Sequence, residues 1–334
     1  MTNDWSMPVG ASHATILGLG ASRPSRVVPN SELVEAIDSS DEWIQQRSGI
    51  KTRRWVAEGE DLLTMSAEAS RQALEHAGIE AAQIDSIVVA TCTHTMQTPA
   101  LAAKLAFELG TQAPAAFDIS AACAGFCHAL GLASDMVRAG TARHVLVVGA
   151  ELLSAMTSKT DRGTAFIFGD GAGAVVVGPS ETPGIGPVVW GSDGELYDAI
   201  RQSVDWRDVL AEDSPEMPFI QMDGPAVFRW ASYEMAKIGQ ATLDRTGIKA
   251  EDLDVFVPHQ ANMRIIDAMA RAMKLPEHVK IARDIAEQGN TSAASIPLAL
   301  GRMYDEGDAK SGDTALLIAF GAGLSYAAQV VRLP

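Results

Sequence analysis

The chain has few cysteines and few basic residues, and both shortages exclude classes of protein. Three cysteines among 334 residues, Cys92, Cys123 and Cys127, are too few and too odd in number for a disulfide framework. Lys and Arg number 26 against 42 Asp and Glu, and the resulting net charge of −16 argues against nucleic acid or an anionic membrane as the main partner. A reducing cytoplasm is the simplest location.

Long apolar runs and metal-ligand patterns are also missing. No apolar run approaches membrane-spanning length, and the first twelve residues carry Asp4 without the apolar core of a signal peptide. None of the seven histidines stands at metal-ligand spacing with Cys or carboxylates, which argues against a zinc site. We therefore expect no metal and no membrane contact, and a flexible N-terminus over residues 1–12.

Apolar residues are plentiful and follow a regular order. They make up 47% of the chain against 20% charged residues, enough for a large core. Apolar strands alternate with helical patterns, as in strand 84–91, helix 99–110 and strand 114–119. This alternation predicts a mostly parallel α/β sheet.

The second half of the chain repeats the first in outline. Strand 253–258 followed by helix 262–274 repeats the order of a strand and a helix in the first half, and Gly-rich turns close both series. Self-similarity at half the chain length predicts a duplicated domain. We place the two halves at residues 13–180 and 181–334, with their equivalent helix starts facing each other at the centre.

Cys123 stands between the apolar strand 114–119, expected to be buried, and a helix that runs to Gly140. At a helix start, free backbone N–H groups and the helix dipole favour a thiolate, so we expect a lowered pKa. Ala122 and Gly125 leave room for a substrate. The alternative is a buried structural cysteine.

Two polar residues stand at positions that the duplication brings near Cys123. His259 ends strand 253–258, at the sheet edge where α/β proteins form their sites. Asn290 precedes a helix, as Cys123 does in the first half. A lone histidine at a strand end is usually structural, but a Cys, a His and an Asn at equivalent turns predict a shared site.

Several stretches in register resemble one family, β-ketoacyl-acyl-carrier-protein synthase III. The three signature-like stretches are 118–126, 258–265 and 288–295, and residues 41–50 and 168–173 match as well. The resemblance covers nearly the whole chain. It implies the thiolase-like fold, an α/β architecture of two pseudo-repeats in five layers, αβαβα, and a homodimer.

The resemblance also implies a chemistry in two steps. Cys123 takes the acyl group of an acyl-CoA, and malonyl-acyl carrier protein (malonyl-ACP) then loses CO₂ and attacks the acyl-Cys123. His259 and Asn290 donate hydrogen bonds to the malonyl thioester oxygen. The backbone N–H groups of Cys123 and Ala322 form an oxyanion hole, although the family usually has Gly at position 322. The products are 3-oxoacyl-ACP, CoA and CO₂, which begins fatty-acid synthesis without any cofactor.

The family's CoA site carries over to positions on several segments. A Trp four residues before an Arg on one helix face suits a stacked purine, although a core Trp beside a solvated Arg is the simpler interpretation of the spacing alone. The resemblance adds Arg162, Gly224 and Asn262 to this site. Without the resemblance, Gly224 would be interpreted simply as a turn residue. The CoA-binding residues expected are Trp43, Arg47, Arg162, Gly224 and Asn262.

The acyl carrier protein is acidic, so we expect a local basic patch beside His259. Each basic residue alone is more simply a solvated surface charge. The expected ACP-binding residues are Arg229, Arg264, Arg271 and Lys274. Thr98 occupies the family loop that closes the partner's acyl pocket, and its small side chain leaves room for a longer or branched starter.

Two other functions remain open. A priming ketosynthase or acyltransferase of a polyketide pathway would use the same three residues. A non-catalytic partner subunit would have no reason to keep Cys123, His259 and Asn290 together. A thiolase proper would need a second reactive cysteine in the Gly-rich loop 320–323, which has none.

Overall fold

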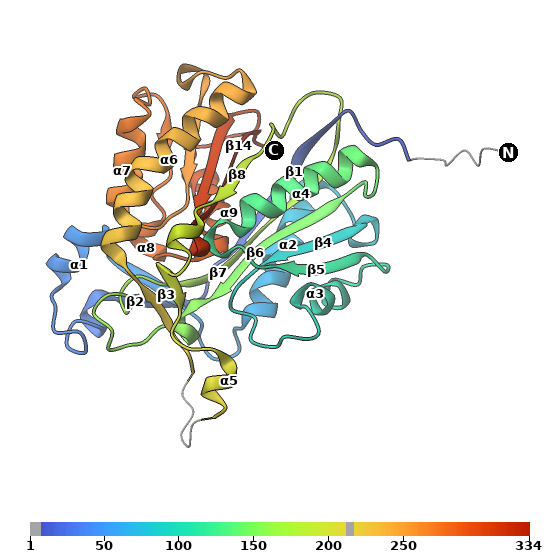
Figure 1. The fold of residues 1–334 in the computed structure, drawn as a ribbon. Coiled ribbons are helices and arrows are strands. Elements are labelled where there is room, and N and C mark those ends of the chain that lie inside the picture. Colours follow the sequence, from blue (N-terminus) through green and yellow to red (C-terminus); the bar gives the residue numbers. More distant parts are fainter. Residues whose placement is uncertain (1–7, 212–216) are drawn as a thin grey trace.

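Two five-stranded sheets lie side by side in the molecule (Figure 1), and the computed structural model describes residues 8–211 and 217–334. The first sheet has the order β1 (His13–Ser22), β7 (Asp170–Ser180), β6 (Val145–Leu152), β4 (Ser86–Ala90) and β5 (Ala115–Ile119). The second has the order β12 (Lys280–Ile281), β11 (Val255–Pro258), β13 (Thr314–Phe320), β14 (Ser325–Arg332) and β8 (Val189–Ser192). The expected flexibility of residues 1–12 concerns mainly residues 1–7, which lie outside the described residues.

Each sheet is mostly parallel, as expected: four of its five strands run in one direction, and a single strand, β7 or β14, runs opposite to them. In the first sheet β6, β4 and β5 run parallel, while β1 and β7 pair antiparallel with their neighbours. The second sheet repeats this, with β12, β11 and β13 parallel and β14 and β8 antiparallel. The reversal of β14 follows from its connection: a short turn joins β13 to β14, and a turn without a crossover helix reverses the chain.

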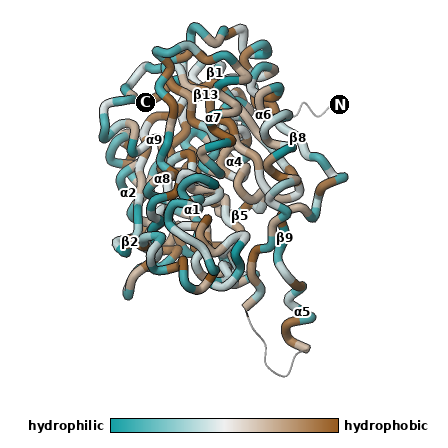
Figure 2. The backbone as a smooth tube through the Cα atoms, turned by 90° about the vertical axis from the view of Figure 1, so that its left-hand side faces the viewer, coloured by the Kyte–Doolittle hydropathy of each residue, from teal (hydrophilic) through white to brown (hydrophobic). Residues whose placement is uncertain are grey.

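Helices cover both faces of each sheet and make the expected five layers, αβαβα. The outer face of the first sheet carries α2 (Leu62–Ala77) and α3 (Leu101–Leu109), and that of the second carries α6 (Gly224–Thr246) and α7 (Met263–Ala272). Between the sheets lie α4 (Gly125–Ala139) and α9 (Ser295–Glu306). Hydrophobic segments accordingly gather inside the molecule (Figure 2).

The two central helices are buried because they are apolar on most of their surface. Phe126 and Leu130 of α4 are 1% and 0% exposed, and residues 295–301 of α9 are all buried. Each helix ends at a glycine in the left-handed region, Gly140 and Gly307, both at φ 76°.

The remaining elements are short and lie around this core. They are β2 (Arg26–Pro29), α1 (Asp41–Ser48), β3 (Thr52–Trp55), β9 (Ile200–Gln202), α5 (Trp206–Val209), β10 (Ile220–Met222) and α8 (Ile285–Gln288). The segment around α5 projects from the body of the molecule (Figures 1 and 2).

Two strands differ from the prediction. Strand β7 already begins at Asp170, so the glycines expected in a turn lie inside it; a Cβ atom at Gly173 would lie 2.6 Å from Cβ of Pro297, and glycine therefore allows α9 to pack closely. Strand β5, expected to be buried, is the edge of its sheet, and none of its residues is fully buried.

Candidate active site

Two strained turns meet between the sheets, and each one leads into a central helix. The turn Ala122–Ala124 leads from β5 into α4, and the turn Ser292–Ala294 leads into α9. Each contains a non-glycine residue in the left-handed region, Ala122 at φ 45° and Ser292 at φ 47°. Such strain persists only where the surroundings impose it, often at functional sites. The turns contact each other, as the duplication predicts.

The Gly-rich loop after β13 approaches Cys123 from the second sheet. A Cβ atom at Gly321 would lie 2.5 Å from the backbone nitrogen of Cys123, so only glycine fits there. Gly323 has φ 76°, whereas Ala322 is not among the described residues with positive φ. Alanine at position 322 therefore carries no left-handed backbone strain, and it directly follows Gly321, which approaches the backbone of Cys123.

The expectation of a lowered thiol pKa is wrong. Cys123 is only partly accessible, and burial raises the pKa of its thiol to about 12, with the negative charge of Glu151 acting in the same direction. The Ser292 hydroxyl and the Cys123 N–H oppose this shift without cancelling it. Desolvation outweighs the helix start because the apolar surroundings penalise the thiolate directly. The resting group is a neutral thiol.

His259 follows β11 and is held at its backbone and its ring. Its N–H donates to the carbonyl of Ile318 at 2.8 Å, and its ring meets that of Phe320 edge-on with centroids 5.5 Å apart. The residue is 3% exposed, and burial lowers the pKa of His259 to about 3. The imidazole is therefore neutral near pH 7, with one N–H donor and one acceptor nitrogen.

A hydroxyl identifies which ring nitrogen carries the hydrogen. Nδ1 of His259 lies 2.7 Å from Oγ of Ser295, the first residue of α9, and that oxygen also accepts from the N–H of Gln260 at 3.4 Å. Within residues 8–211 and 217–334, the ring nitrogen is the one acceptor in reach of the Ser295 hydroxyl hydrogen. We assign Ser295 as the donor to Nδ1 on this ground, which places the ring hydrogen on Nε2.

The amide of Asn290 is oriented in a similar way. Its Oδ1 accepts the N–H of Ser292 at 2.8 Å, which leaves the Nδ2 hydrogens as donors. Two backbone bonds of 2.9 Å, to Ile167 and from Gly169, fix the residue. His259 and Asn290 thus both present N–H groups, as stabilisation of a developing negative charge requires.

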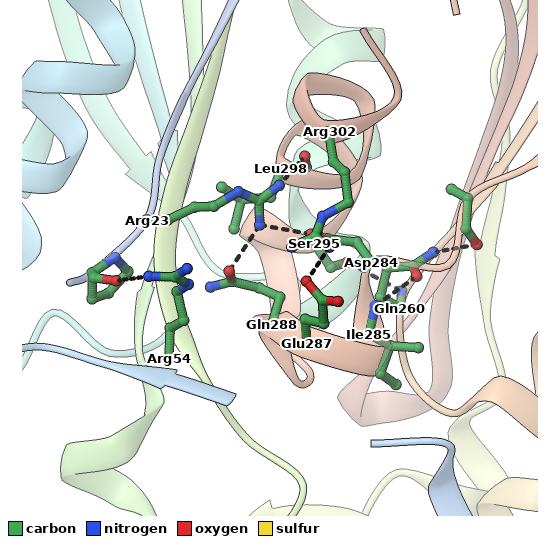
Figure 3. Close-up of polar contacts among 12 residues, drawn as sticks. Arg23, Arg54, Gln260, Asp284, Ile285, Glu287, Gln288, Ser295, Leu298 and Arg302 are labelled. Carbon is green, nitrogen blue, oxygen red and sulfur yellow. Dashed lines mark hydrogen bonds and ion pairs between the residues drawn. The ribbon is translucent and has the colours of Figure 1, made fainter. Parts of the chain in front are cut away.

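Behind these residues a polar network joins distant parts of the chain (Figure 3). Asp284, 2% exposed, pairs with Arg23 at 2.9 Å and with Arg302 at 2.6 Å. Arg23 also donates to the side chain of Gln288 at 2.8 Å and to the carbonyl of Leu298 at 2.7 Å. We call Arg23, Asp284, Gln288 and Arg302 the Asp284 clamp. It fixes the segment before Asn290 to the loop after β1.

Four of the residues expected to bind CoA lie together at α1. The guanidinium carbons of Arg47 and Arg162 lie 5.6 and 5.2 Å from the ring centre of Trp43. Asn262 caps α7 and donates to the carbonyl of Arg47 at 3.0 Å. Trp43 is partly buried and packs edge-on against Phe166, while Arg47 is exposed, so the simpler interpretation of a packed Trp beside a solvated Arg stays open. Gly224 begins α6.

The four basic residues expected to bind the carrier protein are all exposed. Arg229 is on α6, while Arg264 and Arg271 are on α7, which packs against α6; Lys274 follows α7. The guanidinium of Arg264 lies 4.9 Å from the ring centre of Phe228. None of the four forms an ion pair with a described residue.

Thr98 is exposed. It belongs to the segment between β4 and α3, which comes before the turn that holds Cys123 in the sequence. Nothing among the described residues of the single chain places it in an acyl pocket. Its segment carries an apolar side chain on the surface, Met96, which is 50% exposed, and Phe107 of α3 is 88% exposed.

Three further polar residues were not singled out by sequence patterns. Ser295 and Ser292 belong to the stretch 288–295, but only the folded chain shows that one bonds His259 and the other lies at the turn beside Cys123. Glu151 is 0% exposed at the end of β6. A single acidic residue inside an otherwise apolar strand was the available signal for it.

The described residues contain no helix long and apolar enough for a membrane, and no group of three or more His, Cys, Asp or Glu side chains arranged for a metal ion.

Comparison with known proteins gives the family. Residues 117–194 match the model for 3-oxoacyl-[acyl-carrier-protein (ACP)] synthase III, and residues 243–333 match its C-terminal model. A β-ketoacyl-[acyl-carrier-protein] synthase III of Streptomyces glaucescens is 58% identical over 325 residues, which cover 97% of this chain and 98% of that protein. The chain belongs to the β-ketoacyl-ACP synthase III family.

Solved structures of such enzymes share the fold. The synthase III of Aquifex aeolicus matches with a TM-score of 0.87 and 38% identity, over 96% of this chain and 99% of that one. A priming β-ketosynthase of a polyketide biosynthetic pathway matches with a TM-score of 0.96 and 47% identity, over 99% and 98% of the two chains. The protein is therefore an acyltransferase-type enzyme with the thiolase-like fold expected from its sequence.

Proposed function

We propose that this synthase III condenses an acyl-CoA with malonyl-ACP through an acyl-Cys123 intermediate, giving 3-oxoacyl-ACP, CoA and CO₂ and initiating fatty-acid synthesis. The observation that carries the proposal is the meeting of the Cys123 turn with the turn that follows Asn290, with a loop packed on the backbone of Cys123. The reaction uses its two substrates and no cofactor. We place it in the cytoplasm, where its three free cysteines stay reduced.

In the first half-reaction the Cys123 sulfur attacks the thioester carbon of the acyl-CoA. The N–H groups of Cys123 and Ala322 would hold the resulting oxyanion, and the close approach at Gly321 supports this pairing. The adenine would lie against Trp43 and the phosphates beside Arg47 and Arg162, which flank that ring. Gly224 and Asn262 would contact the pantetheine arm.

In the second half-reaction malonyl-ACP loses CO₂, and the carbon released attacks acyl-Cys123. Negative charge develops on the malonyl thioester oxygen, where Nε2–H of His259 and Nδ2–H of Asn290 would donate. The orientation that Ser295 and Ser292 impose on these two side chains supports the assignment. The exposed cations Arg229, Arg264, Arg271 and Lys274 would receive the acidic carrier protein.

We also propose that the enzyme is a homodimer. Strand β5 is the edge of the first sheet, and its backbone pairs with β4 alone among the described strands. An uncovered sheet edge is a ready site for a second chain. Met96 and Phe107, both exposed, are close in sequence to β5 and would be covered together with it. Light scattering in solution tests the dimer directly.

A priming role in a polyketide pathway is the second candidate, and the neighbour with a TM-score of 0.96 is the observation that favours it. Such an enzyme would use the same three residues with a different starter or carrier protein. Parallel rates with the carrier proteins of the two pathways separate the candidates.

The deciding experiment is the mass of the intact protein after incubation with a panel of acyl-CoAs. We expect one acyl group per chain, mapped by peptide analysis to Cys123 and absent from Cys123→Ala. A label on Cys92 or Cys127, or one that survives in Cys123→Ala, would contradict the acyl-Cys123 mechanism.

A further inference from the structure

The two side-chain donors of the proposed decarboxylation come from different segments, and strand pairing joins these segments only in part. His259 follows β11, and Asn290 lies just after α8. Strand β12 pairs with β11 at Val255 and Phe256, and the N–H of Ala282 extends this pairing with a 3.0 Å bond to the carbonyl of Phe256. This pairing therefore stops short of both His259 and Asn290.

The side chain of Gln260 continues the link where the strand pairing ends. Gln260 directly follows His259 and is 1% exposed. Its Nε2 donates to the carbonyl of Pro258 at 2.7 Å and to that of Ala282 at 3.3 Å. Its Oε1 accepts the N–H of Ile285, the first residue of α8, at 3.1 Å. One buried amide thus joins the end of β11 to the residue after β12 and to the start of α8 (Figure 3).

Only an amide satisfies all three partners of the Gln260 side chain. Two partners are carbonyl oxygens and need a donor, while the third is an N–H group and needs an acceptor. The partners also decide which side-chain atom is the nitrogen, because a flipped amide would place its oxygen against both carbonyls. A hydrocarbon side chain here would leave the buried N–H of Ile285 without this acceptor, which costs free energy.

The segment on the other side of Asn290 is tied to the same pair of residues. Ser295, the first residue of α9, accepts the N–H of Gln260 at 3.4 Å, and its hydroxyl lies 2.7 Å from Nδ1 of His259. Asn290 therefore stands between two segments, one ending in Ile285 and one beginning at Ser295, that both connect to His259 and Gln260.

We propose that Gln260 is a positioning residue that sets the separation of the His259 and Asn290 donors. The proposal rests on the roles that the proposed function gives to these two side chains. Helix α8 is a single turn, closed by a 3.1 Å bond from the Gly289 N–H to the Ile285 carbonyl, so a shift of Ile285 is passed directly to Asn290. Two donors stabilise one oxygen only when both reach it, and a misplacement of about 1 Å can cost 10²-fold in rate.

Gln260→Met tests the proposal, because methionine keeps the length and the unbranched shape of the side chain but makes none of the three hydrogen bonds. Malonyl-CoA decarboxylation, measured as released CO₂, should fall by about 10- to 10²-fold. Acylation of Cys123 by acyl-CoA should stay close to the wild-type rate, since that step does not use the two donors. Undiminished decarboxylation, or an equal loss in both half-reactions, would overturn the positioning role.

Gln260→Glu is the second variant and should restore part of the rate. A protonated carboxyl has one O–H donor and one acceptor, and burial favours this form. At pH 6 this variant should therefore decarboxylate malonyl-CoA faster than Gln260→Met, and equal rates would contradict a role for the hydrogen bonds. Should Gln260→Met fail to fold, the rise of the Gln260→Glu rate relative to the wild type between pH 8 and pH 6 carries the test, and the absence of a rise overturns the proposal.

Gln72 on the outer helix α2 provides the matched control. Its Oε1 accepts the N–H of Ala21 at 3.0 Å, so this amide also joins two distant segments, but away from the candidate site. Gln72→Met should leave both half-reactions unchanged.

Crystal structures of the wild type and of Gln260→Met separate this proposal from the proposed function. They give the distance between Nε2 of His259 and Nδ2 of Asn290, which should change by more than about 0.5 Å, the tolerance within which such groups must be held. An unchanged distance overturns the positioning role even where the assays agree with it. A wild type that fails to decarboxylate malonyl-CoA overturns the roles of His259 and Asn290 in the proposed function, while the measured distance still decides the role of Gln260.

Discussion

The residues around the Cys123 thiol orient the N–H donors of two side chains, His259 and Asn290. Nδ1 of His259 is occupied by Ser295, and Oδ1 of Asn290 is occupied by the Ser292 N–H. We expect His259→Ala and Asn290→Ala to lower malonyl decarboxylation by about 10²-fold or more, the usual cost of one oxyanion donor. Acylation of Cys123 should suffer less. Single-turnover assays of each half-reaction check this, and wild-type condensation in both variants would contradict the roles assigned.

Ser295 allows a finer control of the same idea. Ser295→Ala removes the donor to Nδ1 and should lower decarboxylation without changing acylation, whereas Ser295→Thr keeps a hydroxyl and should restore part of the rate. Ser70→Ala is a matched control, since the hydroxyl of Ser70 is also buried but bonds a helix carbonyl in α2. It should leave both half-reactions unchanged.

The neutral state of His259 also makes stability depend on pH. Its pKa is lowered to about 3 in the folded chain against 6.5 for the ordinary group. Between these values the unfolded chain binds the extra proton, so this contribution is fully present above pH 6.5 and is lost as the pH falls. Between pH 7.5 and 5.0 the loss is about 2 kcal/mol.

Urea unfolding of the wild type and of His259→Asn at both pH values measures this contribution. The difference between the two proteins should shrink by that amount at the lower pH, because the variant lacks the titrating ring. Glu151 and Asp170 have raised pKa values from burial and act in the opposite direction, but they are present in both proteins. An unchanged difference would mean that His259 is not held neutral.

At the scale of elements, helix α7 combines two duties. Its N-cap Asn262 lies beside the Trp43 site, and its exposed face carries Arg264 and Arg271. Reversing both arginines to Glu should raise the KM for malonyl-ACP and spare acyl-CoA use, since an exposed charge acts mainly on encounter. An equal loss with malonyl-CoA would show instead that the helix was damaged.

A charge-reversal control is available on the neighbouring helix. Arg245 is exposed near the end of α6, about 24 Å along the helix from Arg229 at 1.5 Å per residue. Arg245→Glu changes the net charge in the same direction but lies far from the proposed docking face. Its KM for malonyl-ACP should stay close to that of the wild type.

Helices with a recognisable end could be predicted from the sequence. Features that depend on packing between distant segments could not. Apolar spacing and a terminal glycine predicted α4 up to Gly140. The glycines at the start of β7 looked like a turn because their purpose, the approach of α9, depends on Pro297, far along the chain. The pattern over 224–246 led to no prediction, although Asp223 caps this helix.

The candidate site likewise has features that the sequence predicts and features that it does not. Cys123, His259 and Asn290 stand at strand ends or helix starts that a sequence pattern reveals, and the turns they belong to do converge. The pKa of Cys123 could not be predicted, because it depends on burial and on Glu151, which comes from another strand. A local sequence pattern reveals that Cys123 stands at a helix start, which lowers the pKa of the thiol. It does not reveal the burial, which raises that pKa by more.

At the scale of the whole molecule, starter choice is expected to depend on a second chain. Thr98 is exposed in the single chain, three residues before Leu101, whose N–H donates to Asp118 of the edge strand β5. If it floors the partner's acyl pocket, Thr98→Phe should cut kcat/KM for branched four- or five-carbon acyl-CoAs and spare acetyl-CoA. The discrimination should be about tenfold or less per carbon. An unchanged ratio of isobutyryl- to acetyl-CoA use would leave Thr98 a contact residue only.

The Asp284 clamp has a consequence for how the chain could be divided. Arg23 comes from the first half, while Asp284, Gln288 and Arg302 come from the second, so this link does not need a continuous backbone between β7 and β8. Residues 181–183, between those strands, are exposed. Two fragments divided there and co-expressed should associate into one stable particle. Arg23→Ala should weaken their association, which co-purification yields measure, because it removes the ion pair and hydrogen bonds that Arg23 makes to the second fragment while Asp284 keeps Arg302.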